Sequence, residues 1–590
     1  MRTSGLVLLA GLALVGAPGT TRAGDPPPPP PAVPPFAFDL APSAVAVYDR
    51  FTIAAVNGIE SATPFGAYPT TVRGHDLRDD GRYLPVTPSL DDLPAILALR
   101  VPSELPAKPV PLAFDPRDGA PVAGSGTYRV DPDPRDASRP GLAATWTFGT
   151  KGAPTDRDRY EVRKGLAEVS LRWKGGRGGP PATSRVHLRW RRIPLVRDPK
   201  DPPRDVEETL EFRLREVRAG RDEAFSKEVA KAIDEGVAWL RTQQKPDGSF
   251  PPEREWAVGT TALALLTLAE CDVERDDPAM KRGLTWLAQQ TPTKTYDRAL
   301  ALCAMERAYT PPAEEALIAS GRLTTRIRHL PPDRRTWAER IAADLEASAV
   351  SPGSFGYPSA FNSTLPIDSS NTQYAALGLR AASRLSIPVK DTTWLGLARH
   401  FGVLRERHGP RAEVSLGREG EKAPKPGETV VKEKEKTRTV EALGFLYSPT
   451  TESWASMTCA GIACLELSRH ELLRAKSPRL TPAFDAEIEE RIRSGWAWLD
   501  RHWGVDRHPE HPSNGWTLYY LYALERAAVF SRVRDVGGKD WYFEGATELL
   551  LRRAKAGTWA EAGLSDLVNT CLAVLFLKKA TPQLTDESSK

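Results

Sequence analysis

The sequence predicts a multidomain protein in which an N-terminal all-β, sandwich-like domain precedes an all-α domain built as an (α/α)6 toroid. Two observations lead to this fold class. Apolar and polar residues alternate with period two up to about residue 218, and from about residue 222 the apolar spacing becomes helical. Within the helical part, one eight-residue pattern recurs six times, which is typical of a repeat architecture.

The first 35 residues predict an export signal and a spacer. Arg2 precedes an apolar run at 5–17, and Ala23 offers a small residue for cleavage, so we assign 1–24 to a signal peptide. The run is too short to span a membrane. Residues 25–35 contain the proline run 26–31, which favours an extended spacer. We expect an exported protein, periplasmic or secreted, with no integral membrane segment after cleavage.

Residues 36–218 are expected to form the accessory β domain. Leu210 and Phe212 alternate with Glu211 and Arg213, and the stretch 186–190 shows the same alternation. A period of two with charged residues on one side describes antiparallel strands that have one solvated face. Clusters of Gly and Pro between these stretches supply the turns. Whether this region is one domain or two stays open.

The recurring pattern is predicted to mark the inner helices of a ring that spans 222–580. Five of the six copies open with Thr, the fifth position is always apolar, and the eighth is Leu or Met. The copies are 261–268, 298–305, 372–379, 458–465, 517–524 and 570–577. They are apolar on nearly all sides, so they must be buried. An open solenoid is the alternative, but it would need polar capping repeats.

A second helix type and a glycine turn precede several copies. The outer helices carry a Gly-x-x-Trp motif at 236–239, 283–286 and 495–498. Turns that run from Gly to an aromatic residue follow at 248–250, 353–355 and 557–559. Gly can adopt the positive φ that ends a helix. Residues 405–440, rich in Lys, Glu and Pro, are expected to form a mobile charged loop, and 581–590 a disordered tail.

These residues resemble the squalene cyclase and protein prenyltransferase superfamily. The resemblance is carried by Gln244, Gly248 and Phe250, with Gly236 and Trp239 ahead of them. The resemblance implies that 222–580 form the toroid and that the chain is an exported bacterial member of this superfamily. The Asp-x-Asp-Asp acid of the cyclases does not occur here, nor does the Asp-x-Cys of the prenyltransferase zinc site. We therefore predict no cofactor and no metal site.

The candidate site is one mouth of the ring, where parallel inner helices would present their N-terminal ends. The residues that gather there are Asp368, Asn371, Thr372, Glu452, Thr458, Asn514, Trp516, Asp566, Asn569 and Thr570. They can be read as helix caps and first-turn residues, or as a polar ligand site above an apolar interior. Asp368 and Glu452 form the candidate pair for general acid and base catalysis.

Composition narrows the partners. A net charge of +4 on 590 residues predicts no binding of nucleic acid. Three functions remain: a non-enzymatic binding or interaction protein, an enzyme acting on a terpenoid or polyprenyl substrate, and a carbohydrate-active enzyme. The first is favoured because the family's catalytic motifs are missing. The expected partner is a small apolar or glycan molecule, or another protein.

Overall fold

The computed structural model describes residues 44–56, 59–64, 69–73, 112–114, 121–123, 126–133, 136–148, 160–172, 182–194, 202–310, 330–357, 367–418, 439–512 and 515–579. The expected signal peptide, spacer and C-terminal tail lie outside these residues, as does Asn514. The domain boundaries given above stay predictions.

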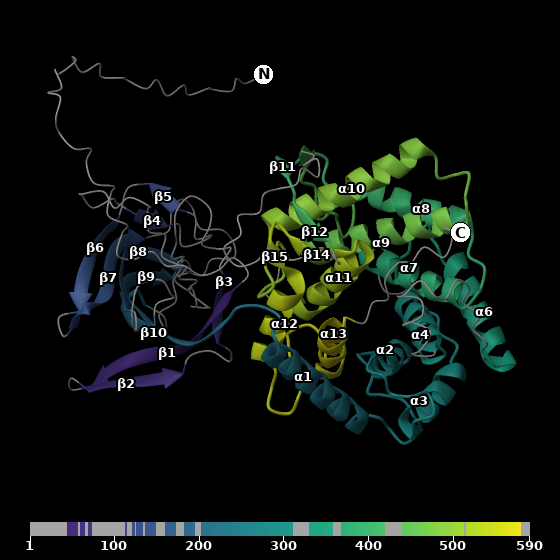
Figure 1. The fold of residues 1–590 in the computed structure, drawn as a ribbon, viewed down its shortest axis with the longest axis horizontal. Coiled ribbons are helices and arrows are strands. Elements are labelled where there is room, and N and C mark those ends of the chain that lie inside the picture. Colours follow the sequence, from purple (N-terminus) through teal and green to yellow (C-terminus); the bar gives the residue numbers. More distant parts are fainter. Residues whose placement is uncertain are drawn as a thin grey trace, which may run out of the picture.

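An antiparallel sheet lies on the N-terminal side of the molecule (Figure 1). Its strands run in the order β2-β1-β10-β9-β8-β7-β6, and β3 also pairs with β1. Their bounds are β1 (Val45–Val56), β2 (Ile59–Pro64), β3 (Thr70–Arg73), β6 (Gly126–Asp133), β7 (Asp136–Phe148), β8 (Tyr160–Arg172), β9 (Thr183–Pro194) and β10 (Arg204–Arg218). A separate pair joins β4 (Leu112–Phe114) to β5 (Pro121–Ala123). The prediction of antiparallel strands is confirmed, and the second layer of a sandwich stays a prediction.

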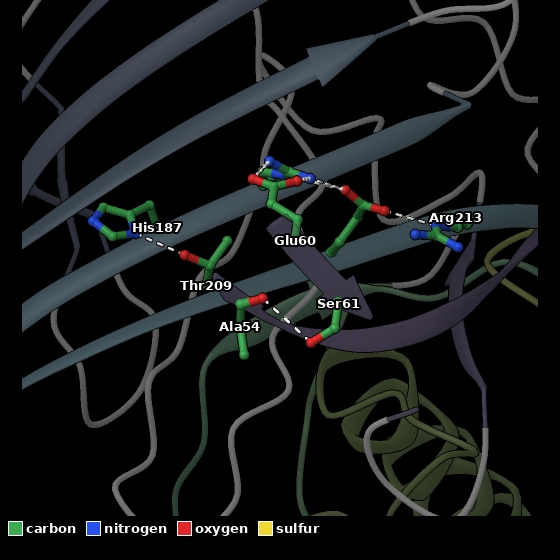
Figure 2. Close-up of polar contacts among 8 residues, drawn as sticks. Ala54, Glu60, Ser61, His187, Thr209 and Arg213 are labelled. Carbon is green, nitrogen blue, oxygen red and sulfur yellow. Dashed lines mark hydrogen bonds and ion pairs between the residues drawn. The ribbon is translucent and has the colours of Figure 1, made fainter. Parts of the chain in front are cut away.

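Alternation along β10 separates an apolar face from a charged one. Leu210 and Phe212 are buried, as the period-two pattern predicts, and Glu211 between them is also buried, where it bonds to two arginines. On the other face Arg185 of β9 bonds to Glu211 at 2.7 Å and to Glu60 of β2 at 2.9 Å. Figure 2 shows the labelled Glu60 and Arg213 within this network of polar contacts. The bond to Glu211 joins neighbouring strands, whereas the bond to Glu60 joins residues 125 positions apart, and such cross-strand pairs stabilise a sheet.

A helical body makes up the rest of the described chain (Figure 1). The eight-residue copies all lie in helices, which we call the inner helices: α2 (Ala257–Glu270), α4 (Thr295–Ala308), α7 (Ser369–Arg384), α9 (Ala455–Arg474), α11 (Thr517–Phe530) and α13 (Asp566–Lys578). One outer helix precedes each of them: α1 (Glu223–Thr242), α3 (Pro278–Ala288), α6 (Pro332–Ala347), α8 (Asp391–Val403), α10 (Pro482–Arg501) and α12 (Trp541–Arg552). None of the described helices has the length and apolar character that a membrane span requires.

The inner helices contact one another in a closed circuit. In chain order α2 packs on α4, α4 on α7, α7 on α9, α9 on α11 and α11 on α13, and α13 packs on α2. Lys578, at the end of α13, pairs with Asp272, just after α2, at 2.6 Å. Because the last inner helix touches the first, the apolar faces of all of them meet in a common core.

Three glycine turns dock a pair of helices on the next pair. Gly248 has a φ of +96°, and a side chain there would overlap the carbonyl oxygen of Arg282 in α3. Gly353 faces Gly396 of α8 in the same way, and Gly557, in the last turn, faces Glu235 of α1. Gln244 adds a hydrogen bond from its amide nitrogen to the carbonyl of Ala279 at 2.9 Å. The glycine positions therefore allow close backbone packing as well as the turn itself.

Sheet and helices share a buried boundary. Val45 and Val47 of β1 belong to the same apolar core as Phe225 of α1. Arg73 of β3 pairs with Glu544 of α12 at 3.4 Å and with Glu548 at 3.7 Å. The sheet is therefore attached to the ring through both apolar and charged contacts.

The ends of the predicted charged loop form short strands. β11 (Arg411–Glu413) pairs with β13 (Thr439–Glu441). A three-stranded sheet contains β12 (Leu416–Arg418), β14 (Val533–Val536) and β15 (Lys539–Asp540). Where we expected a mobile loop over 405–440, its flanks thus hold ordered structure, because β11 pairs with β13, and Val440 of β13 and Val414 just after β11 are buried in the apolar core. The part at 419–438 lies outside the described residues.

Candidate functional site

The N-terminal ends of the inner helices lie side by side, because residues of one unit cap the helix of its neighbour. Asp297 of α4 accepts the N–H of Gly259 in α2 at 2.7 Å, and Glu561 accepts the N–H of Leu518 in α11 at 3.1 Å. Glu253, before α2, accepts the N–H of Ser565, at the start of α13, at 2.7 Å. Each bond satisfies a backbone donor that a helix leaves open. We call this end of the ring the mouth.

Asp368 is the N-cap of α7 and is almost fully buried. One of its carboxylate oxygens accepts the backbone N–H of Asn371 at 2.8 Å and the hydroxyl of Ser370 at 2.5 Å. The other accepts the side-chain amide of Asn371 at 2.8 Å. Burial raises the pKa of Asp368, while these hydrogen bonds act in the opposite direction. The carboxylate therefore has the contacts of a capping group.

The other candidate acids occupy different environments. Glu452 is exposed and lies before Trp454, the N-cap of α9. Asp566 is exposed in the first turn of α13, where a negative charge complements the helix dipole. Asn569 is buried, and its amide donates to the carbonyls of Glu561 and Leu564, both at 3.1 Å. The structure shows Asp368 buried and Glu452 at the surface, without a contact between them.

The candidate threonines accept hydrogen bonds from the backbone of the segments that precede their helices. Thr372 accepts the backbone N–H of Phe355 at 3.1 Å, and Thr570 accepts that of Trp559 at 3.2 Å. Thr458 does the same for Phe445 at 3.1 Å. These three hydroxyls are buried and engaged by the backbone.

Aromatic side chains line the mouth in a continuous cluster. We define the aromatic cluster as Trp256, Tyr296, Tyr357, Tyr374, Trp516 and Tyr519. Ring centroids are 5.3 Å apart for Trp256 and Tyr296, and 4.3 Å apart for Tyr296 and Tyr374. Tyr519 continues the series at 6.4 Å from Tyr374 and 6.2 Å from Trp516. The cluster therefore crosses from α2 through α4 and α7 to α11.

Part of this cluster faces solvent. Trp256, Tyr296, Tyr357 and Trp516 are half-buried, whereas Tyr374 and Tyr519 are buried beneath them. Trp516 has a φ of 70°, in the left-handed region that is unusual for a bulky residue. Such strain is often found at functional positions. The indole is packed against Gly563, where a side chain would touch it.

His508 and His511 form a stacked pair of imidazole rings beside the start of α9. His508 is buried and accepts the N–H of Ser456 through Nε2 at 3.1 Å, and its ring stacks on Tyr520 at 5.4 Å. Burial, followed by the charge of His511, lowers the pKa of His508 to about 2. The imidazole is therefore neutral and serves as a cap. His502 contacts Glu510 at 3.1 Å.

The described residues hold no group of three or more His, Cys, Asp or Glu side chains placed to bind a metal ion. Burial raises the pKa of all five cysteines: Cys271, Cys303, Cys459, Cys464 and Cys571. A thiol in such surroundings stays protonated and is a poor nucleophile.

Sequence reasoning missed two groups at this site. Tyr296 and Tyr357 were not candidates, because each is a single aromatic residue outside the recurring pattern, Tyr296 in the first turn of α4 and Tyr357 after a glycine turn. Arg526 of α11 was also missed, although it has only 1% of its surface exposed. Its signal was present in the spacing of Tyr519, Tyr522 and Arg526, which places them on one helix face.

Comparisons with known proteins give distant likenesses only. No protein-family model and no curated protein matches the chain. Among solved structures, the chain is similar to a type II terpene cyclase from Scytonema in complex with its product, merosterolic acid A, at 11% identity and a TM-score of 0.36. This match covers 60% of this chain and 98% of the cyclase.

A second solved structure, reported for the lipid–protein interactions in lipovitellin, matches at 8% identity and a TM-score of 0.15. This match covers 87% of this chain and 57% of the other. At scores this low, neither likeness assigns a function to this chain.

Proposed function

We propose that the helical body is an (α/α)6 toroid that acts as an exported, non-catalytic binding module for a small apolar ligand, which enters at the mouth. The closed circuit of inner helices supports the toroid. The sequence resemblance at Gln244, Gly248 and Phe250 supports its assignment to the squalene cyclase and prenyltransferase type. Export follows from the signal peptide expected at 1–24.

The observation that carries the proposal is the half-buried aromatic cluster across the mouth. Trp and Tyr side chains offer large, rigid apolar surfaces, and their contribution to binding grows with the area they bury. Trp256 and Trp516 stand at opposite ends of the cluster, with Tyr296 and Tyr357 between them. A ligand lying on these rings would cover several partly exposed surfaces at once.

The carboxylates at the mouth favour binding over acid–base chemistry. Asp297, Asp368, Glu253 and Glu561 all accept backbone N–H groups. A general acid or base must instead reach the proton that it transfers on the substrate. For the same reason these four carboxylates are not free to accept hydrogen bonds from the many hydroxyls of a glycan. An apolar ligand therefore fits better than a carbohydrate, and a binding role fits better than a hydrolase.

The proposal is tested by calorimetric titration of the full-length protein with decanol, with maltohexaose as the glycan probe. We expect decanol to bind and to change tryptophan fluorescence. Trp256→Ala should weaken binding about tenfold, through the loss of buried apolar contact. Trp239→Ala is the matched control, because Trp239 is also half-buried but lies on the outer helix α1. Binding of maltohexaose alone, or equal effects of the two variants, would contradict the proposal.

A further inference from the structure

Arg526 is a buried cation whose guanidinium nitrogens lack a well-formed hydrogen bond to any described residue. Only 1% of its surface is exposed. None of the three guanidinium nitrogens of Arg526 makes a hydrogen bond of normal geometry with a described residue, although the hydroxyl of Tyr374 lies near enough to interact with the guanidinium. The guanidinium carbon instead lies 4.0 Å from the ring centroid of Tyr522 and 5.5 Å from that of Tyr374. The guanidinium therefore makes cation–π contacts with two tyrosine rings.

Burying this charge needs a counter-charge. Arginine stays protonated in proteins, and an unpaired charge in the interior is strongly unfavourable. Contacts with two rings recover only part of that cost. Glu525, the next residue in the chain, acts on the guanidinium through its charge but makes no hydrogen bond with it. The described residues thus leave the guanidinium without a carboxylate hydrogen-bonded to it.

A second buried donor belongs to the same group. Gln373 of α7 is fully buried, and its amide oxygen accepts the hydroxyl of Tyr519 at 3.4 Å. Its amide nitrogen has no hydrogen-bond partner among the described residues. The bond to Tyr519 connects Gln373 to the face of α11 that carries Arg526. The guanidinium of Arg526 on α11 and the amide nitrogen of Gln373 on α7 are therefore both buried donors that lack an acceptor among the described residues.

The face of α11 leads from the mouth to this cation. Tyr519, Tyr522 and Arg526 follow at intervals of three and four residues, so they form one stripe about 10 Å long. Tyr519 belongs to the aromatic cluster, and Arg526 lies deeper in the ring. A ligand that enters along the rings would meet the guanidinium with its inner end.

We propose that Arg526 binds the carboxylate of a ligand whose apolar body lies on Tyr374, Tyr519 and Tyr522. One guanidinium matches one monoanion, and its planar fork suits the two oxygens of a carboxylate. The aromatic surroundings select an apolar body. This inference rests on the proposed function, because the ligand uses the same mouth, and it names the ligand class as apolar monocarboxylic acids.

The test compares decanoate with decanol, which share the apolar chain and differ in the head group. Calorimetry on the full-length protein should show decanoate binding at least about tenfold tighter than decanol. Arg526→Met should remove this preference by lowering the affinity for decanoate at least about tenfold, to that of decanol. Equal binding of both probes to the wild type would overturn the carboxylate site and leave the proposed function standing. If neither probe binds, both fail.

Thermal melting separates a ligand-binding arginine from a structural one. Without ligand, Arg526→Met should melt at the same temperature as the wild type or higher, because it removes a buried charge whose nitrogens lack hydrogen-bond acceptors. Decanoate should raise the melting temperature of the wild type and not that of the variant. The control is Arg307→Met, since Arg307 is also buried but pairs with Glu270 at 2.8 Å. A drop for Arg526→Met as large as that for the control overturns the inference.

Discussion

The backbone N–H of Phe250 donates a hydrogen bond of 3.0 Å to the hydroxyl oxygen of Thr261. This bond ties the end of a glycine turn to the inner helix that follows. The turns ending at Phe355, Phe445 and Trp559 make the same bond to the first threonine of their own helices. The recurrence of Thr at the head of the pattern thus has a physical cause: the hydroxyl satisfies a buried backbone donor.

Replacing Thr261 with Val should lower the free energy of unfolding by about 1–3 kcal/mol, because it leaves the N–H of Phe250 buried and unpaired. Denaturant titration measures the change. Thr547→Val is the control, since Thr547 is also buried but its hydroxyl has no hydrogen-bond partner among the described residues. That variant should be neutral or slightly stabilising. Equal losses would show that the turn bond contributes nothing.

Gly248→Ala should destabilise the protein by more than Gly538→Ala. Both glycines have positive φ, +96° and +83°, so both substitutions carry backbone strain of about 1–2 kcal/mol. Only at Gly248 would the new methyl group overlap the carbonyl of Arg282, whereas Gly538 faces open space. The difference between the two unfolding free energies therefore measures the docking of the turn on α3. No difference would argue against that close packing.

Stability should fall as the pH drops from 7 to 5. Burial lowers the pKa of His400 to about 4, and burial with the His511 charge lowers that of His508 to about 2. Below pH 6.5 these histidines become protonated in the unfolded chain but stay neutral in the folded chain. Each of them therefore lowers the free energy of unfolding by on the order of 2 kcal/mol by pH 5. His400→Gln should flatten the pH dependence of the unfolding free energy. An unchanged slope would contradict the assignment.

Arg73→Met should loosen the sheet from the ring. The substitution leaves Glu544 and Glu548 without one of their partners at a buried boundary, at a cost of about 3 kcal/mol. Arg191→Met is the control, because Arg191 pairs with Asp205 at 3.3 Å on the exposed face of the sheet. Calorimetric unfolding should show a lower transition for the first variant and little change for the second. The reverse order would contradict the contact.

Much of the helical body could be predicted from the sequence, because its signal is local. Leu265 and Leu302 fill the same position of a pattern that the helix period imposes, and both are buried in inner helices. Turn glycines such as Gly248 could be recognised because only Gly adopts that conformation readily. These features need no knowledge of distant contacts.

The site was harder to predict because its contacts join distant residues. Asp368 was expected near helix α7, and it lies there as a cap, yet nothing local predicts that Glu253 caps α13, 312 residues away. In the sequence, Glu525 and Arg526 resemble an ordinary pair of exposed charged residues. Its burial between Tyr374 and Tyr522 depends on how the inner helices meet in the core.

The claim on which the rest depends is that the last inner helix packs on the first. Lys578 and Asp272 are 306 residues apart and lie 2.6 Å from each other at the surface of that contact. A zero-length carbodiimide, which joins an amine to a carboxylate as an amide, should couple them within one chain. Peptide mass spectrometry of the monomer would detect the product. The ion pair of Lys539 and Asp500, 39 residues apart, serves as the positive control.

We predict the Lys578–Asp272 cross-link in the wild type and its loss in Lys578→Arg. A monomer that yields the control cross-link but never the one between Lys578 and Asp272 would contradict a closed ring, and with it the mouth and the site at Arg526.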